Sequence, residues 1–194
     1  LAAFIAAGQL LSRWVFCRSP RVVRITLGAA LSLLMLMWLP ALFSFELGFT
    51  LLSQLLALAA AAATGFISAK KAVKPLMAVR EPELRPYLCC VIPAVLLLCG
   101  LTLSHTLPHM PDGGLGSGQS TYGDLSLHLA ICTSIVNAKF PLENSLMLGA
   151  TMAYPYLSDS VASTFYLLGM PLNTSMAFTG TLMMLLTYAG YGLL

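Results

Sequence analysis

The chain has 194 residues, of which 58% are hydrophobic and only 9% are charged. A typical soluble domain carries roughly 25% charged residues, so the polar residues here are too few to cover a surface that faces water. The composition excludes an ordinary soluble domain and indicates a membrane protein. The net charge is +3, but no basic stripe is interleaved with aromatic residues, so no nucleic-acid partner is expected.

Long uncharged runs predict helices that cross the lipid bilayer. A hydrocarbon core about 30 Å thick needs roughly 20 apolar residues at about 1.5 Å per residue. The first 16 residues form a shorter apolar run, which we expect to be a truncated span. A run at 158–170 is either a short span or the end of one that begins near Leu146. Four further runs are long enough to cross: 25–45, 50–68, 87–107 and 174–194.

The basic residues fall mainly into two clusters, and these predict the orientation of the spans. Short loops rich in Lys and Arg stay in the cytoplasm. The two clusters are two spans apart, so both can lie on that side, and everything from about His105 onward is then expected outside. The clusters consist of Arg13, Arg18, Arg21 and Arg24, followed by Lys70, Lys71, Lys74, Arg80 and Arg85.

The sequence therefore predicts an all-α, polytopic transmembrane bundle in three regions. Residues 1–107 hold about four spans, residues 108–157 form an outer loop, and residues 158–194 hold the C-terminal transmembrane helices. Within the loop, 124–138 reads as a helix with one apolar face that is too short to cross, and we expect it to lie along the membrane surface. The chain starts at Leu1 and ends within an apolar run, so we expect a piece of a longer protein.

Asp124 and His128 are the first pair of residues with chemical potential. They are four residues apart, so a helix places them on one face. A carboxylate beside an imidazole can orient the ring or share a cation with it. Asp124 also stands where the helix is expected to begin, and Asp is a favoured N-cap. A lone histidine among leucines is commonly a hydrogen-bonded packing residue, so both interpretations stay open.

Asp159 borders the expected span at 158–170. Ionisable groups at the edge of a span are costly and are often functional, although helix capping accounts for an aspartate here equally well. His105, His109 and Asp112 are of metal-binding types, but prolines between them disrupt a common helical face. The glycine-rich run 113–118 lacks the Lys-Ser/Thr signature of a P-loop and is expected to be a flexible connection.

Three short motifs lie between residue 122 and about residue 169. They are Tyr-Gly-Asp-Leu-Ser-Leu-His at 122–128, Phe-Pro-Leu-Glu-Asn at 140–144, and the stretch from Gly149 through Tyr-Pro-Tyr-Leu-Ser-Asp at 154–159. This quarter of the chain resembles the multi-spanning glycosyltransferases of the GT-C fold, the group of protein mannosyltransferases and arabinose transferases. In that family a long outer loop carries an acidic residue near the membrane, followed by a helix along the surface. The chain departs from the family in having about four spans before this loop, and in having Leu125 where many members carry a second acid.

The resemblance implies a transferase that uses a polyprenyl-phosphate sugar donor at the outer face of a bacterial plasma membrane. Asp124 would be the general base that deprotonates the acceptor hydroxyl, and His128 would be its catalytic companion. A divalent metal ion is a candidate cofactor, with no ligand set assigned. The substrate-binding residues would be Asp159, Tyr122, Tyr156 and Lys139, the last as a partner of the phosphate because no other basic residue follows Arg85.

Two other classes of function remain open. In a transporter or channel subunit, Asp124, His128 and Asp159 would be ion or proton sites. Against this, no central span carries a charge, and no inverted repeat of broken helices is visible. In a non-catalytic scaffold, the small-residue faces of the helices would instead support other membrane subunits.

Overall fold

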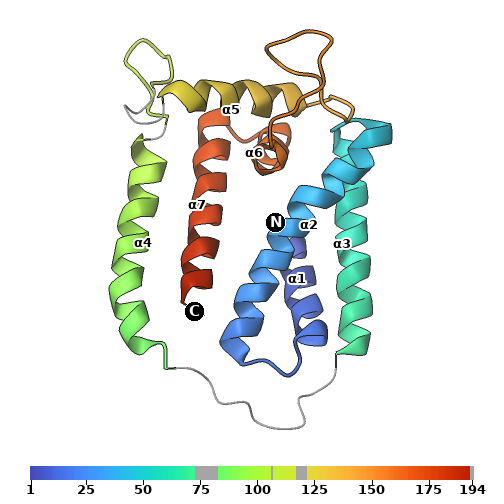
Figure 1. Ribbon diagram of the computed structural model, residues 1–194, viewed down its shortest axis with the longest axis vertical. Helices are drawn as coiled ribbons and strands as arrows, with labels where there is room; N and C mark the ends of the chain where they lie inside the picture. The colour runs from blue at the N-terminus through green and yellow to red at the C-terminus, as the bar shows by residue number, and fades with distance from the viewer. Residues whose placement is uncertain (73–82, 106, 117–121, 193–194) are drawn as a thin grey trace.

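The computed structural model describes residues 1–72, 83–105, 107–116 and 122–192, without the side chains of Pro86 and Tyr122. Within these ranges the chain forms helices, turns and isolated bridges but no β-strand, which confirms the all-α prediction (Figure 1). The helices are α1 (Ala2–Val15), α2 (Arg21–Leu47), α3 (Leu51–Lys71), α4 (Arg85–His105), α5 (Tyr122–Ile135), α6 (Leu157–Leu167) and α7 (Leu172–Tyr191).

Three helices in the described part of the chain are long and apolar enough to cross a membrane. They are α2, α3 and the part of α4 from Tyr87 to His105, and they cover the predicted runs 25–45, 50–68 and 87–107. The length and apolar character of these three helices are those of a membrane protein. Charged side chains stand only near the ends of the three, as expected where hydrocarbon is the solvent.

Two of the remaining helices, α1 and α6, are shorter than a full span. α1 has 14 residues and α6 has 11, so α6 is only about 16 Å long. The idea that a span begins near Leu146 is wrong, because residues 141–156 are irregular and α6 begins at Leu157. α7 covers the expected last run with 20 residues, and its crossing of the membrane stays a prediction.

Small residues bring α1, α2 and α3 into close contact. A Cβ added to Gly8 would lie 2.4 Å from the carbonyl oxygen of Gly28, so α1 and α2 touch backbone to backbone. On α3, Ala57 and Ala61 are fully buried, and their small side chains let a neighbouring helix approach closely. In hydrocarbon such close approach replaces the hydrophobic effect as the source of helix association, because lipid tails are as apolar as leucine.

The described members of both basic clusters lie at one end of the bundle. In Figure 1 the α1–α2 connection, the end of α3 and the start of α4 all lie at the bottom. Lys74 and Arg80 lie outside the described residues. This common end agrees with one cytoplasmic face for both clusters, while the side of a membrane that it faces stays a prediction.

α5 runs crosswise over the opposite end, above α7 and α6 (Figure 1). Backbone hydrogen bonds fix its C-terminal exit to the α2–α3 turn: Phe49 N–H donates to the Ala138 carbonyl at 2.7 Å, and Asn137 N–H donates to the Phe49 carbonyl at 3.0 Å. Phe140 N–H also donates to the Ser44 carbonyl at 3.1 Å. The crosswise orientation is the one expected of a helix along a membrane surface, and its contact with lipid stays a prediction.

Gly8→Ala is expected to destabilise the bundle by about 1–3 kcal/mol, because the added methyl group overpacks the contact with α2. The methyl carbon would lie 2.2 Å from Ser32 Oγ and 2.4 Å from a backbone oxygen. Denaturant unfolding in detergent micelles measures this loss. Gly100→Ala in α4 is the matched control, because nothing lies within 4 Å of its Cβ. Equal stability of the two variants would contradict the close α1–α2 contact.

Candidate functional site

The apolar face of α5 places one histidine over α6. Ile131, Cys132 and Ile135 are fully buried on this face, and His128 lies three to four residues before the first two, on the same side of the helix. On α6, the first turn carries Asp159, of which only 5% is exposed. Because the buried face of α5 packs against α6, the histidine and the aspartate meet.

His128 and Asp159 form an ion pair or hydrogen bond between the two helices. The Nδ1 atom of His128 lies 3.0 Å from each carboxylate oxygen of Asp159. The side chain of Asp159 is 7% exposed and that of His128 is 28% exposed. Tyr156 is the N-cap of α6, and no side chain caps this helix. Asp159 therefore acts through its contact with α5 rather than as a cap, which corrects the capping interpretation.

Burial and the histidine act in opposite directions on the Asp159 carboxyl. Burial raises its pKa above the ordinary value, and the hydrogen bond from His128 lowers the pKa in part. Since Nδ1 of His128 faces the carboxylate, Nε2 is the ring nitrogen left for a substrate. Burial also raises the pKa of the Cys132 thiol to about 11, so this cysteine is a packing residue rather than a nucleophile.

Tyr154 and Ser163, for which the sequence predicted no role, lie next to the His128–Asp159 pair. The ring of Tyr154 stands edge-on to the His128 ring, with centroids 5.7 Å apart. The hydroxyl of Ser163, fully buried, lies 2.9 Å from the carbonyl oxygens of both Cys132 and Asp159, and so links α6 to α5. A serine in an apolar helix gives no signal in the sequence. Tyr154 lies in one of the recognised motifs, beside a proline.

In the structure, His128 contacts Asp159 and not the predicted Asp124. Asp124 lies in the first turn of α5 and is exposed, one turn before His128 on the same helix. Among the described residues, the carboxylate that contacts His128 is that of Asp159. Asp124 is thus left open to solvent near the pair, at the positive end of the α5 dipole, where a carboxylate is stabilised.

The other predicted substrate-binding residues are spread around α5. The half-buried ring of Tyr156 packs edge-on against Phe140, with centroids 5.3 Å apart. Lys139 is exposed and lines an open cavity of about 520 Å³ together with Glu143 and Asn144. Tyr122 begins α5, and its side chain lies outside the described part. Lys139 and Tyr156 thus line two different cavities.

No group of three or more His, Cys, Asp or Glu side chains that could hold a metal ion occurs within the described ranges. His128 and Asp159 supply two side chains of ligand type, so a divalent ion there would need other ligands. His109 lies beside Asn173, 3.2 Å away, and His105 beside Ser104. These two histidines thus have separate neighbours.

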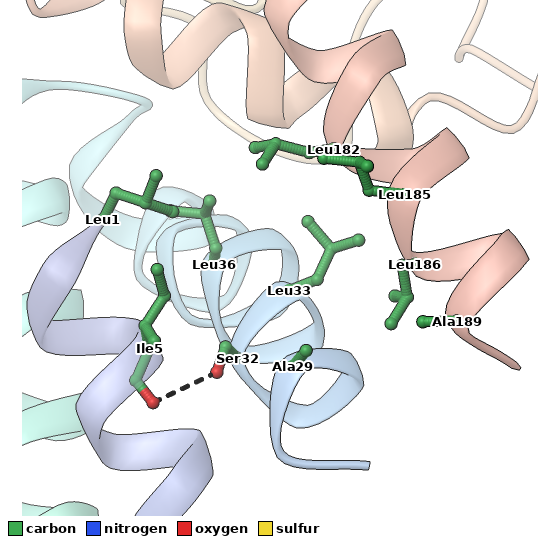
Figure 2. Close-up of a pocket in the computed structure, with 10 residues that line it drawn as sticks. All are labelled: Leu1, Ile5, Ala29, Ser32, Leu33, Leu36, Leu182, Leu185, Leu186 and Ala189. Atoms are coloured by element: carbon green, nitrogen blue, oxygen red, sulfur yellow. Dashed lines mark hydrogen bonds between the residues drawn. The ribbon is translucent and has the colours of Figure 1, made fainter. Parts of the chain in front are cut away.

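An apolar cavity of about 300 Å³ lies between α1, α2 and α7 (Figure 2). Seven of its ten lining residues are Leu or Ile, and Figure 2 shows leucines of α2 and α7 facing each other across it. The hydroxyl of Ser32 is already bonded to the carbonyl of Gly28 at 2.6 Å. No titratable side chain occurs among the described residues that line this cavity.

Comparison of the chain with protein-family models, with curated proteins and with solved structures gives no match. Within the described residues, the site is the buried carboxylate of Asp159 that holds the partly exposed imidazole of His128, at the end of an all-helical bundle with three membrane-type helices.

His128→Ala is expected to destabilise the fold by about 1–3 kcal/mol at neutral pH, because it leaves the buried Asp159 carboxylate without its partner. Adding Asp159→Asn removes the buried charge and should restore part of the loss. Burial holds the pKa of Asp159 above its ordinary value, so the folded state binds this proton more readily than the unfolded state, and the penalty shrinks as pH falls.

Unfolding in detergent at neutral and mildly acidic pH tests this prediction. Thr133→Ala on α5 is the control, because its exposed hydroxyl bonds only to carbonyls of its own helix. A double variant that is no more stable than His128→Ala would show that the pair is not coupled.

Proposed function

We propose that this chain is part of a membrane glycosyltransferase similar to the GT-C-fold enzymes. It would transfer a sugar from a polyprenyl-phosphate donor to a hydroxyl group at the membrane surface. The observation that carries the proposal is the placement of α5 across the bundle end, with His128 held by Asp159 and Asp124 exposed one turn away.

The proposed reaction is a displacement at the anomeric carbon of the sugar. The acceptor oxygen forms the new bond to that carbon while the bond to the phosphate oxygen breaks, and polyprenyl phosphate leaves with the electron pair. Asp124 takes the proton of the acceptor hydroxyl. Its exposure supports this role, since the acceptor has to reach it from water. General base catalysis of this kind contributes about 10²–10⁴-fold in rate.

His128 would hold the reacting groups in place. With Nδ1 bonded to Asp159, Nε2 can hydrogen-bond to the acceptor hydroxyl or to a phosphate oxygen. Asp159 has too little exposed surface to contact a substrate well, so we assign it to the positioning of His128. Tyr156, Tyr122 and Lys139 remain the proposed substrate contacts, with Lys139 as the exposed cation for the phosphate.

The position of the pair favours an enzyme over a transporter. His128 and Asp159 belong to α5 and α6, outside the three helices that are long enough to cross. An ion pathway needs polar groups near the middle of the spans. Proteoliposome flux that depends on Asp124 and Asp159 would favour transport instead.

Asp124→Asn is expected to lower sugar transfer from a labelled polyprenyl-phosphate sugar by about 10²–10⁴-fold, because the acceptor proton loses its base. The assay uses membranes that contain the full-length protein. His128→Gln and Asp159→Asn should also lower transfer, whereas Glu46→Gln, an exposed carboxylate at the end of α2, should not. Full transfer by Asp124→Asn would make the base assignment wrong.

The proposed location places the site outside and the basic end of the bundle in the cytoplasm of a bacterium. In a cysteine-free background, Ser145→Cys should react with a membrane-impermeant maleimide in intact cells, because Ser145 is exposed at the α5 end. Glu83→Cys, exposed at the basic end, should react only after permeabilisation. The reverse pattern would overturn the proposed orientation.

A further inference from the structure

Exposed cations gather where α1 and α3 end together, at the basic end of the bundle (Figure 1). A Cβ on Gly65 would lie 3.2 Å from the Cα of Ala7, so the two helices touch at these residues. About two turns further along each helix, the ammonium of Lys71 lies 4.9 Å from the centroid of the Trp14 ring. The two helices therefore run in the same direction and end at the same level. We call the exposed cations there the α1–α3 cations: Arg13, Lys70 and Lys71.

The α1–α3 cations have no carboxylate partner in the described part of the chain. The ion pair found there joins His128 to Asp159, at the opposite end of the bundle. Both lysines instead lie over aromatic rings, since Nζ of Lys70 is 4.3 Å from the centroid of Phe66 and that of Lys71 lies over Trp14. A cation–π contact favours one position of an ammonium group but leaves its charge in place. The positive charges are thus positioned and uncompensated, which favours an anionic ligand.

Apolar side chains adjoin these cations on the side of the membrane. Phe66 and Ile67 precede the lysines by one turn and are 62% and 49% exposed. Because α3 is long and apolar enough to cross a membrane, its terminal lysines stand at the level of the lipid headgroups, which tryptophan also prefers. A ligand that matches both parts of this surface has an acyl chain along α3 and a negative group at its polar end. Free phosphate or a nucleotide would contact the cations alone.

We propose that the ends of α1 and α3 bind an anionic phospholipid, with its phosphate at the α1–α3 cations and an acyl chain along Phe66 and Ile67. Orientation in the membrane requires only that basic residues be numerous on one side. It does not require ammonium groups over aromatic rings beside exposed apolar side chains, which is the surface that a lipid headgroup and its chain would contact. This binding site is independent of the proposed function, which concerns the opposite end of the bundle.

Trp14 is a built-in probe of this site, because the chain holds two tryptophans and Trp38→Phe removes the other. In phosphatidylcholine vesicles, phosphatidylglycerol with a nitroxide near its headgroup should quench Trp14 fluorescence in a saturable manner. Half-quenching is expected at a mole fraction about tenfold lower than for phosphatidylcholine with the same label, which carries no net charge. In Trp14→Phe, the remaining Trp38, beside Phe140 toward the other end of α2, should be quenched alike by both lipids.

Lys70→Gln should raise the half-quenching mole fraction of the phosphatidylglycerol probe about fivefold, because one attracting charge is lost. Arg85→Gln is the matched control. It also removes one exposed positive charge at the basic end, but from α4, which packs against α7, so it should leave the quenching of Trp14 unchanged. Both side chains are exposed, so neither substitution disturbs the packing of the bundle.

Two outcomes would overturn the proposal. Equal quenching of Trp14 by the two lipids would show that no anionic lipid is selected at the ends of α1 and α3. Equal effects of Lys70→Gln and Arg85→Gln would show a diffuse attraction of the whole basic end and no site. High salt gives a further check: the preference for phosphatidylglycerol should fall as the Debye length shrinks from about 10 Å at 0.1 M to about 3 Å at 1 M, and a preference that salt leaves unchanged would count against the α1–α3 cations.

Discussion

The hydrogen-bonded contact between the α2–α3 turn and the segment after α5 is the constraint on which the site depends. Phe49 bonds through its backbone to both Asn137 and Ala138, and its side chain is fully buried. The same contact brings Phe140 onto Phe49, with ring centroids 6.1 Å apart. This contact holds the C-terminal end of α5 against the α2–α3 turn, at the end of the bundle that α5 crosses (Figure 1).

The crosswise orientation decides which polar residues meet. It presents the buried face of α5 to the first turn of α6, so His128 reaches Asp159, while Asp124 in the first turn of α5 remains exposed. A buried carboxylate without a partner would be costly, and the imidazole offsets part of this cost. The pair thus joins two helices and also leaves one ring nitrogen directed away from the carboxylate, which is the arrangement that a catalytic imidazole requires.

The two halves of the protein use different means of association. α1, α2 and α3 approach closely at Gly8, Gly28 and two alanines of α3, as membrane helices do where water cannot drive them together. Around α5 and α6, association relies on aromatic rings and on polar contacts such as that of Ser163. Among the described residues of α1, α2 and α3, no charged side chain is buried. The other half holds the His128–Asp159 pair, and there we propose that a lipid-borne substrate meets its acceptor.

The sequence by itself determined the helical class, the three membrane-type helices and the two basic clusters, because the length and charge of apolar runs are local properties. It also singled out Asp124, His128 and Asp159, since ionisable residues are rare in such a chain. It related His128 to Asp124 and did not find the contact with Asp159, because helical spacing relates only residues on one helix. Asp159 is 31 residues away, and only the packing of α5 on α6 could bring it within 3.0 Å. The roles of Ser163 and Tyr154 were likewise decided by the tertiary structure, since contacts between helices depend on orientations that the α2–α3 turn imposes from a distant part of the chain.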